Sequence, residues 1–300
     1  MKGLKRLKLV IDNVSKKYKD KWAVNHFSAQ LTEGVYALLG PNGSGKTTLM
    51  RMLADILKPT SGRILIGNKD ISVMDEDYRD LLGYLPQEFG TYNNFTAERF
   101  LMYFASLKGL DKKSAQEKVT EVLHLVNLLE ERKRKTKTFS GGMKRRLGIA
   151  QALLNDPKIL IVDEPTAGLD PKERIRFRNL LSEISGDRIV LLSTHIVSDI
   201  EYIAKEIFLM KQGELIKQSH VEGLINEMKG KVWNVSINQE ELANIQQKFK
   251  VGNIQRKEVG IEVRIVHEEK PLPNAFEAAP TLEDVYLYYF DEEVLQGVQA

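Results

Sequence analysis

The sequence predicts an α/β protein built on a largely parallel sheet, and two features carry that prediction. Short apolar runs alternate with longer segments of helical periodicity; the runs lie at 35–39, 64–66, 81–85, 159–162, 189–192 and 207–210. The runs are apolar throughout, which is typical of strands buried on both faces. Several of them end in polar or glycine-rich segments, at the strand ends where open α/β sheets bind ligands.

Composition supports a folded protein of ordinary type. The 300 residues are 42% hydrophobic and 28% charged, with a net charge of +3, so disorder and a strongly basic nucleic-acid-binding surface are not expected. The chain has no cysteine, which excludes disulfides and thiolate catalysis. This length allows one large domain or two smaller ones.

No apolar run approaches the roughly 18–20 residues of a membrane-spanning helix. Residues 1–8 are basic but lack the apolar stretch of a signal peptide, so we expect them to lead into a first strand at 7–14. These observations predict a cytoplasmic protein.

A helical insertion is expected at about 88–155. Thr96 is a candidate N-cap for a helix that ends at Gly109, Asp111 is a candidate N-cap for the next, and a third helix is expected over 141–154. The predicted apolar faces of the first two helices are formed by Phe100, Leu101, Phe104 and Leu107, and by Val119, Val122, Leu123, Val126 and Leu129.

The pattern changes after Gly213. Residues 232–237 and 260–266 alternate as strands do, and they flank a helical segment at 240–249 that precedes a final helix at 281–290. We therefore expect a large α/β domain at 1–220 and a small α+β accessory domain at 221–300.

A phosphate-binding loop directly follows the apolar run at 35–39. The segment fits G-x-x-x-x-G-K-[ST], in which glycines let the backbone N–H groups point at phosphate oxygens. Lys46 is expected to reach the β- and γ-phosphates, and Thr47 to supply a hydroxyl to Mg²⁺. A plain glycine-rich turn is the alternative, which the order of strand, loop and helix disfavours. The candidate nucleotide-binding residues are Gly40, Pro41, Asn42, Gly43, Ser44, Gly45, Lys46, Thr47 and Thr48.

Two acidic residues follow the run at 159–162. Asp163 is suited to hold Mg²⁺, and Glu164 to polarise a water for attack on the γ-phosphorus. Taken alone, the pair could equally end a strand and cap the next turn. The phosphate-binding loop on the same chain favours the catalytic interpretation.

His195 and Gln87 also follow apolar runs. His195 could contact the γ-phosphate from a neighbouring strand end, although a single histidine there is more often an ordinary loop residue. Gln87 stands where the α/β core gives way to the helical insertion; without that position it would read as a surface amide.

A second anion-binding element precedes the third predicted helix. Ser140, Gly141 and Gly142 place a hydroxyl and uncovered N–H groups at a helix start. One chain thus carries two phosphate-binding devices.

The ordered set of these motifs resembles the nucleotide-binding subunit of an ATP-binding cassette (ABC) transporter. The resemblance covers about residues 7–215, and the Ser-Gly-Gly element makes it specific among P-loop NTPases. The segments 81–88 and 280–287 are similar to the exporter branch that handles drugs, antimicrobial peptides and ions. The motifs that carry it are the phosphate-binding loop, Gln87, Ser140-Gly141-Gly142, Asp163-Glu164, Ala167-Gly168-Leu169-Asp170 and His195.

The resemblance implies an ATPase that uses ATP and Mg²⁺, with Glu164, His195 and Gln87 as catalytic residues and Thr47, Gln87 and Asp163 around the metal. Tyr18 would stack on adenine, with Trp22 as a competitor, and Asp170 would contribute to the nucleotide site.

Two subunits, as a homodimer, would pack head to tail so that Ser140, Gly141 and Gly142 of one cover the γ-phosphate bound by the other. Separate integral membrane permease subunits are the implied partners, which places the protein on the inner face of the cell membrane; no nucleic acid is expected. Met143 and Phe139 depart from the Gln and Leu most often found in the signature.

A soluble ABC ATPase that moves no solute is the alternative. Tandem translation factors need two copies of the motifs, and the interval between Lys46 and Glu164 is too short for the coiled coil of a repair ATPase. A regulatory module without hydrolysis is disfavoured because Glu164 and His195 are both present.

Basic residues at 132–137 and 144–146 flank the Ser-Gly-Gly element. They could bind anionic lipid, nucleic acid or an acidic partner loop, but a solvated helix-linker face is the favoured interpretation.

Overall fold

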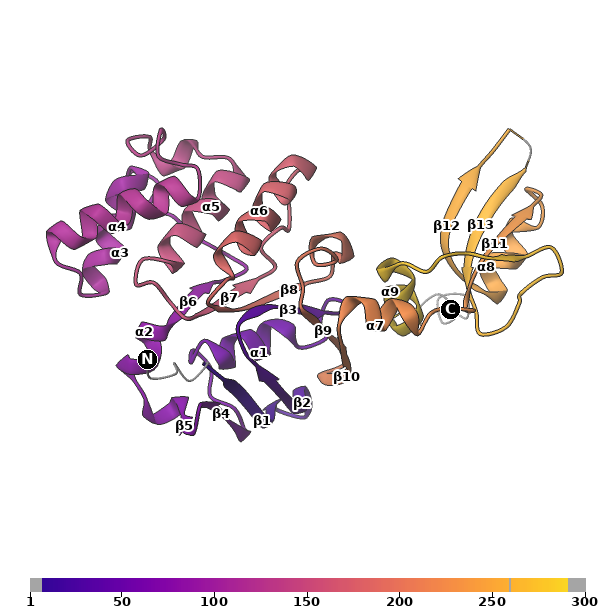
Figure 1. Ribbon diagram of the computed structural model, residues 1–300, viewed down its shortest axis with the longest axis horizontal. Coiled ribbons are helices and arrows are strands. Elements are labelled where there is room, and N and C mark those ends of the chain that lie inside the picture. Colours follow the sequence, from indigo (N-terminus) through magenta and orange to yellow (C-terminus); the bar gives the residue numbers. More distant parts are fainter. Residues whose placement is uncertain (1–6, 259, 291–300) are drawn as a thin grey trace, which may run out of the picture. The chain divides into compact units, whose positions relative to one another are not determined.

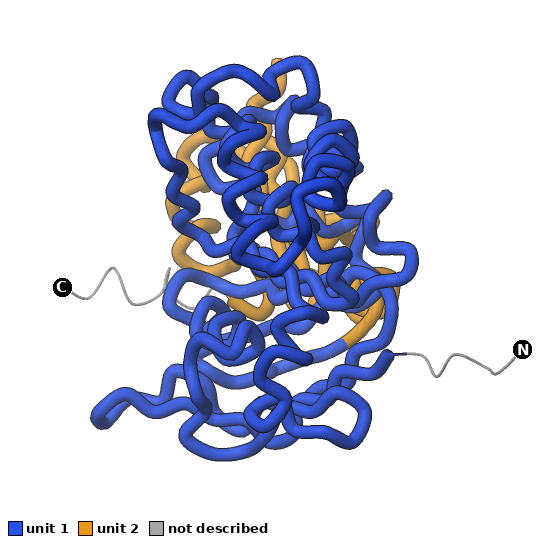
Figure 2. The backbone as a smooth tube through the Cα atoms, turned by 90° about the vertical axis from the view of Figure 1, so that its left-hand side faces the viewer, with its two compact units in different colours: residues 1–218 blue, residues 219–300 orange. Residues whose placement is uncertain are grey.

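The computed structural model describes residues 7–258 and 260–290. Its contacts divide the chain into two compact units, residues 1–218 and 219–300, two residues from the boundary expected after 220 (Figure 2). The outermost parts of both expected domains, 1–6 and 291–300, lie outside the described residues. Each unit is described by itself.

A six-stranded sheet forms the centre of the first unit, in the order β10-β9-β3-β8-β7-β6 (Figure 1). Strand β3 pairs in parallel with β8 and β9, and β7 pairs in parallel with β6 and β8. The α/β prediction is therefore confirmed. The strands are β3 (Gly34–Leu39), β6 (Leu82–Leu85), β7 (Ile159–Asp163), β8 (Ile189–Thr194), β9 (Glu206–Lys211) and β10 (Glu214–Ser219).

A second sheet, ordered β2-β1-β4-β5, corrects one expectation about the core. The apolar run at 64–66 belongs to this sheet and not to the parallel one, since Ile64 pairs antiparallel with Ile11. An apolar run alone does not specify its partner strand, because strand pairing depends on the packing of the whole folded chain. The strands are β1 (Leu9–Tyr18), β2 (Lys21–Leu31), β4 (Ser61–Ile66) and β5 (Lys69–Asp70).

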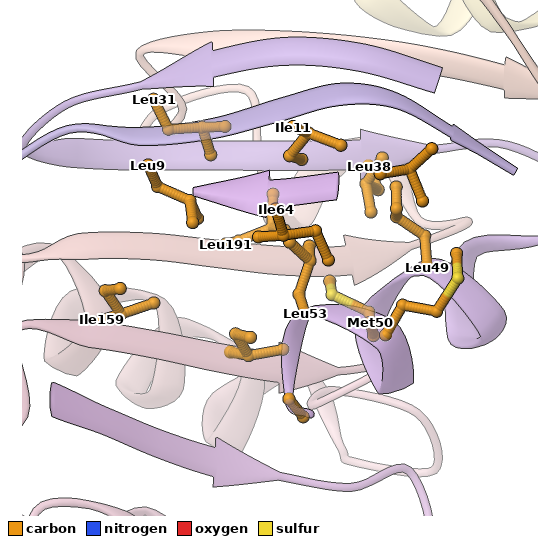
Figure 3. Packing of buried hydrophobic residues seen from close by; sticks show 14 of the residues in the cluster. Leu9, Ile11, Leu31, Leu38, Leu49, Met50, Leu53, Ile64, Ile159 and Leu191 are labelled. Atoms are coloured by element: carbon orange, nitrogen blue, oxygen red, sulfur yellow. The ribbon is translucent and has the colours of Figure 1, made fainter. Parts of the chain in front are cut away.

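Helix α1 (Lys46–Leu53) packs between the two sheets and joins them into one core (Figure 3). Its buried residues Leu49, Met50 and Leu53 belong to a cluster that includes Ile11 of β1 and Leu191 of β8. Burial of these side chains fixes the start of α1, and hence the phosphate-binding loop, against the central sheet.

The helical insertion contains α3 (Ala97–Leu107), α4 (Lys112–Leu125) and α5 (Gly141–Ala152). The Thr96 and Asp111 side chains cap α3 and α4 as predicted. Leu107 is 65% exposed, so the predicted apolar face of α3 ends one turn early, and Ala97 and Ala105 complete its buried side. The remaining helical elements of this unit are α2 (Glu76–Leu81), α6 (Pro171–Ile184) and the 3₁₀ turns Ile71–Val73, Thr136–Thr138 and Val197–Asp199.

The second unit is an antiparallel sheet, ordered β12-β13-β11-β14, with α8 against its apolar face. Strands β11 and β13 match the two predicted alternating segments, whereas β12 was not expected because most of its residues are exposed and polar. The elements are α7 (Val221–Asn226), β11 (Val232–Ile237), α8 (Leu242–Lys248), β12 (Lys250–Arg256), β13 (Ile261–Val266), β14 (Phe276–Glu277) and α9 (Leu282–Phe290).

Among the residues that the structure describes, no helix combines the length and apolar character that crossing a membrane requires.

Candidate nucleotide-binding site

A cavity of about 460 Å³ opens beside the start of α1, where parallel strands of the central sheet end. It brings together segments far apart in the sequence, from β1 and β2, the phosphate-binding loop, the end of β6 and the end of β7. The lining residues are Tyr18, Lys21, Ala23, Asn42, Gly43, Ser44, Gly45, Lys46, Thr47, Thr48, Gln87 and Glu164.

Two glycines of the loop have no substitute in this packing. Gly45 has a φ of 101°, and a Cβ there would lie 2.1 Å from the Ala23 carbonyl oxygen. A Cβ on Gly40 would lie 2.1 Å from the Met210 carbonyl oxygen. Because the loop backbone presses against β2 and β9, only glycine permits its course.

Lys46 is fixed between the loop and the acidic strand end. Its amine donates to the carbonyl oxygens of Gly40 at 2.7 Å and Pro41 at 3.2 Å, and lies 3.5 Å from Glu164 Oε1. Burial lowers the pKa of the Lys46 amine, an effect that Glu164 and Asp163 oppose by favouring the charged form. A buried ammonium at the cavity, held in its charged form by neighbouring carboxylates, is suited to attract a phosphate.

Asp163, the last residue of β7, has the features of a metal ligand. Thr47 Oγ1 donates to its Oδ1 at 3.3 Å and Ser193 Oγ donates to the same oxygen at 2.6 Å. Within residues 7–258 and 260–290, its Oδ2 is buried with no hydrogen-bond partner. Burial raises the pKa of this carboxyl. An orphaned carboxylate oxygen beside a threonine hydroxyl fits the oxygen donors that Mg²⁺ prefers.

Glu164 is held by the side chains of Ser193, His195 and Lys46 in an unusual backbone conformation. Its φ is 45°, which is rare for a residue with a side chain, and its N–H donates to Ser193 Oγ at 2.9 Å. Its Oε2 lies 3.0 Å from Nδ1 of His195, and its Oε1 faces Lys46. The carboxylate is therefore directed at the cavity by both neighbours.

The strand register separates the two aromatic candidates for an adenine platform. Tyr18 pairs with Lys21 and both line the cavity, whereas Trp22 pairs with Lys17 at the adjacent position. Neighbouring residues of a strand point to opposite faces, so Trp22 and Lys17, whose amine lies 5.3 Å from the indole ring centre, face away from the cavity.

The Ser-Gly-Gly element lies apart from these groups. Ser140 is exposed and caps α5 by accepting a hydrogen bond from the Met143 N–H at 3.2 Å. Asp170 is also exposed and caps α6 through the Glu173 N–H at 2.9 Å. Neither residue is among those that line the cavity of its own chain.

Ser193 and Lys21 are further site residues that the sequence did not single out. Ser193 lies opposite Asp163 in the parallel register of β7 and β8, which lets one hydroxyl bond both neighbouring acidic residues. Its position in the Ser-Thr-His segment at the end of β8 was the available sequence signal. Using it would also have required the register of β7 and β8, which sets Ser193 opposite Asp163. Lys21 adds a cation to the rim of the cavity beside Tyr18.

The solvated-face interpretation of residues 144–146 is wrong for two of the three arginine and lysine side chains. Arg145 donates to the carbonyl oxygens of Pro86 and Gln87, and buried Arg146 to those of Val126 and Asn127. Both guanidinium groups are occupied inside the unit, because the first turns of α5 pack against neighbouring loops. They are therefore not a lipid-binding surface either.

Comparison with known proteins agrees with the nucleotide-binding chemistry that the cavity residues indicate. Residues 24–167 match the family model described as ABC transporter. The chain is 41% identical over 231 residues to the uncharacterized ABC transporter ATP-binding protein YxlF of Bacillus subtilis, covering 76% of each chain. It is 32% identical to the linearmycin resistance ATP-binding protein LnrL of the same organism, over 87% of each chain, and 37% identical to the bacitracin transport ATP-binding protein BcrA of Bacillus licheniformis, over 69% of this chain and 67% of that one.

Solved structures are similar as well. The cbiO1 protein of Clostridium perfringens, part of the cbiONQ ABC transporter complex, superposes with a TM-score of 0.67 at 26% identity, over 80% of this chain and 94% of that one. The dimeric post-hydrolysis state of the ATP-binding cassette MJ0796, bound to ADP and phosphate, superposes with a TM-score of 0.64 at 25% identity, over 71% of this chain and 98% of that one.

Proposed function

The chain belongs to the family of ABC transporter ATP-binding proteins, and we propose that its cavity hydrolyses ATP to drive export through separate membrane subunits. Its ATPase activity and its place in a transporter follow from the family. The assignment of roles to residues rests mainly on one observation: Glu164, which lines the cavity, contacts both Lys46 and His195.

In this proposal the phosphate-binding loop and Lys46 bind the phosphates, and Tyr18 stacks on the base. Glu164 accepts a proton from, and orients, the water that attacks the γ-phosphorus. His195 holds the Glu164 carboxylate through Nδ1, which leaves Nε2 to contact the γ-phosphate. Support comes from the fixed 3.0 Å contact between these two side chains.

Thr47, Asp163 and Gln87 would hold Mg²⁺, which when bound neutralises charge on the phosphates. The fit of this set is supported by the orphaned Oδ2 of Asp163 and its contact with Thr47. Ser193 keeps Asp163 oriented from behind, because its hydroxyl occupies the opposite oxygen.

A head-to-tail pair of copies accounts for the separated Ser-Gly-Gly element. Ser140, Gly141 and Gly142 would close over the γ-phosphate bound by the partner copy, and Asp170 would approach the same site. The exposure of Ser140 and Gly141 supports this role, since N–H groups at an exposed helix start can bind an anion carried by another surface.

Export is proposed because two relatives are named for bacitracin transport and linearmycin resistance. The permease subunits would place the protein on the inner face of the membrane, and the second unit would be an accessory domain. Copurification with an integral membrane subunit tests this partner; unchanged resistance to bacitracin and linearmycin in cells that lack the protein would count against export of antibiotics of this kind.

Replacement Glu164→Gln tests the catalytic assignment. The amide keeps the shape of the side chain but cannot take a proton, so we expect ATP binding to persist while turnover falls roughly 1,000-fold. ATP should then trap a dimer that size-exclusion chromatography detects. Glu130→Gln, at an exposed position, is the matched control. Undiminished phosphate release by Glu164→Gln would refute the assigned role.

A further inference from the structure

Arg145 occupies a position between three segments of the ATPase unit. It lies in the second turn of α5, the helix that begins with the Ser-Gly-Gly element. Its guanidinium donates to the carbonyl oxygens of Pro86 at 3.0 Å and Gln87 at 2.5 Å, and more weakly to that of Glu164 at 3.4 Å. One side chain thus bonds the segment after β6 and the segment after β7.

The packing of α5 makes this arrangement specific. At Gly148, three residues beyond Arg145, a Cβ would lie 2.6 Å from Leu85 Cδ1 and 3.2 Å from the Phe89 ring. The helix backbone therefore packs closely against the side chains of Leu85 and Phe89, with no room for a side chain at position 148. This approach directs Arg145 inward while Ser140 and Gly141 remain on the exposed side.

The acceptors indicate positioning and not charge neutralisation. All three are neutral backbone oxygens, and the planar guanidinium suits several acceptors at fixed angles. Burial lowers the pKa of Arg145, and the nearby Asp163 and Glu164 carboxylates oppose that by favouring its charged form. Arg145 thereby holds the backbone of Gln87, and that of Glu164 with its φ of 45°, in place relative to α5.

We propose that Arg145 is a positioning residue for ATP hydrolysis, which holds the backbone of Gln87 in register with the helix that bears the Ser-Gly-Gly element. Movement of α5 is then transmitted to Gln87 through two carbonyl contacts. The proposal rests on the hydrolytic roles proposed above for Gln87 and Glu164.

Variants of the full chain test the proposal by steady-state ATPase kinetics and thermal unfolding. Arg145→Met should lower kcat at least tenfold and leave KM within threefold and the melting temperature within a few degrees. Arg145→Lys keeps one donor group and should recover part of kcat. Lys144→Met, which removes a cation from the neighbouring position of α5, should match the unsubstituted protein in all three quantities.

The partner of Arg145 is identified by combining it with Gln87→Ala. If Arg145 acts through Gln87, the double variant should have the kcat of Gln87→Ala alone. An undiminished kcat in Arg145→Met, a joint loss of kcat and melting temperature, or a multiplied loss in the double variant would each overturn the proposal. If Arg145→Met does not fold, Arg145→Lys decides: a lowered kcat with unchanged melting supports positioning, and full kcat overturns it.

Failure of the two proposals can be told apart. Normal turnover in Glu164→Gln would refute the catalytic site itself, and normal turnover in Gln87→Ala would refute the role of Gln87 together with that of Arg145. A slow Gln87→Ala variant beside a normal Arg145→Met variant would leave the site standing and refute Arg145 alone.

Discussion

The two glycine-rich helix starts of the ATPase unit, at α1 and at α5, have similar local chemistry and different surroundings. The loop before α1 is enclosed: Gly40 and Gly45 press against neighbouring backbone, and the Lys46 amine is bonded on several sides. At α5, Ser140 and Gly141 are exposed, and a Cβ on Gly141 would meet nothing within 4 Å. In the proposed function, the first binds phosphate within its own chain, whereas the second covers a phosphate that a partner copy carries.

This difference distinguishes two kinds of glycine. Replacement of Gly40 or Gly45 should harm folding and nucleotide binding, whereas replacement of Gly141 should harm only the association of two copies. At Gly40 and Gly45 the enclosed start tolerates no added atom, because a Cβ at either position would lie 2.1 Å from a neighbouring carbonyl oxygen. At Gly141 the exposed start tolerates an added atom in the isolated chain, so a loss of function on its replacement would come from another surface. The adjacent Gly142 is different, because it is buried and a Cβ there would lie 2.6 Å from Glu173 Oε2.

Lys46→Ala should have the largest effect on ligand binding. It removes a buried ammonium that would make charge-assisted bonds to phosphate, each worth roughly 1.5–3 kcal/mol, so we expect ATP affinity to fall at least about 100-fold. Equilibrium binding of a fluorescent ATP analogue measures this, with exposed Lys69→Ala as control. Affinity unchanged in Lys46→Ala would contradict the assignment of the loop.

A matched pair of alanine substitutions tests the comparison directly. Gly45→Ala should destabilise the protein by about 3 kcal/mol, because it combines a φ of 101° with a clash against Ala23. Gly141→Ala should change the unfolding free energy by less than about 1 kcal/mol, yet lower ATP turnover at least tenfold. Denaturant unfolding and ATPase assays give both quantities; full turnover in Gly141→Ala would show that the α5 start covers no phosphate.

Ser140→Asp separates the two roles of the residue that caps α5. Aspartate caps helices about as well as serine, so stability should change by no more than about 0.5 kcal/mol, while Ser140→Ala should cost about 1 kcal/mol. A carboxylate facing phosphate should prevent the ATP-dependent dimer from forming. Size-exclusion chromatography in the Glu164→Gln background measures this, and a normal dimer in Ser140→Asp would place the phosphate elsewhere.

The smallest effect concerns the aromatic rim of the α1 site. Tyr18→Ala should raise the KM for ATP about five- to tenfold, as expected for loss of a stacking contact of roughly 1–1.5 kcal/mol. Trp22→Ala should leave KM within twofold, because the register of β1 and β2 turns its ring away from the cavity. An equal rise in both variants would contradict that placement.

Much of the site was accessible from local sequence because its parts are contiguous. The phosphate-binding loop, the acidic pair after β7 and the caps at Thr96 and Asp111 depend on neighbours within a few residues. The family could be recognised for the same reason: the order of such motifs is a linear property. The α/β class followed from apolar runs, which report burial on both faces of a sheet.

Other features required the folded chain because they join residues distant in sequence. Strand pairing places the run at 64–66 in an antiparallel sheet. The register of β1 and β2 places Tyr18, and not Trp22, at the cavity. The same is true of Ser193 beside Asp163 and of Arg145 beside Gln87, separated by 30 and 58 residues. A motif specifies which groups are present, since local backbone geometry needs only local residues. Which groups meet is decided by strand pairing and helix packing, because those contacts depend on the burial of the whole core.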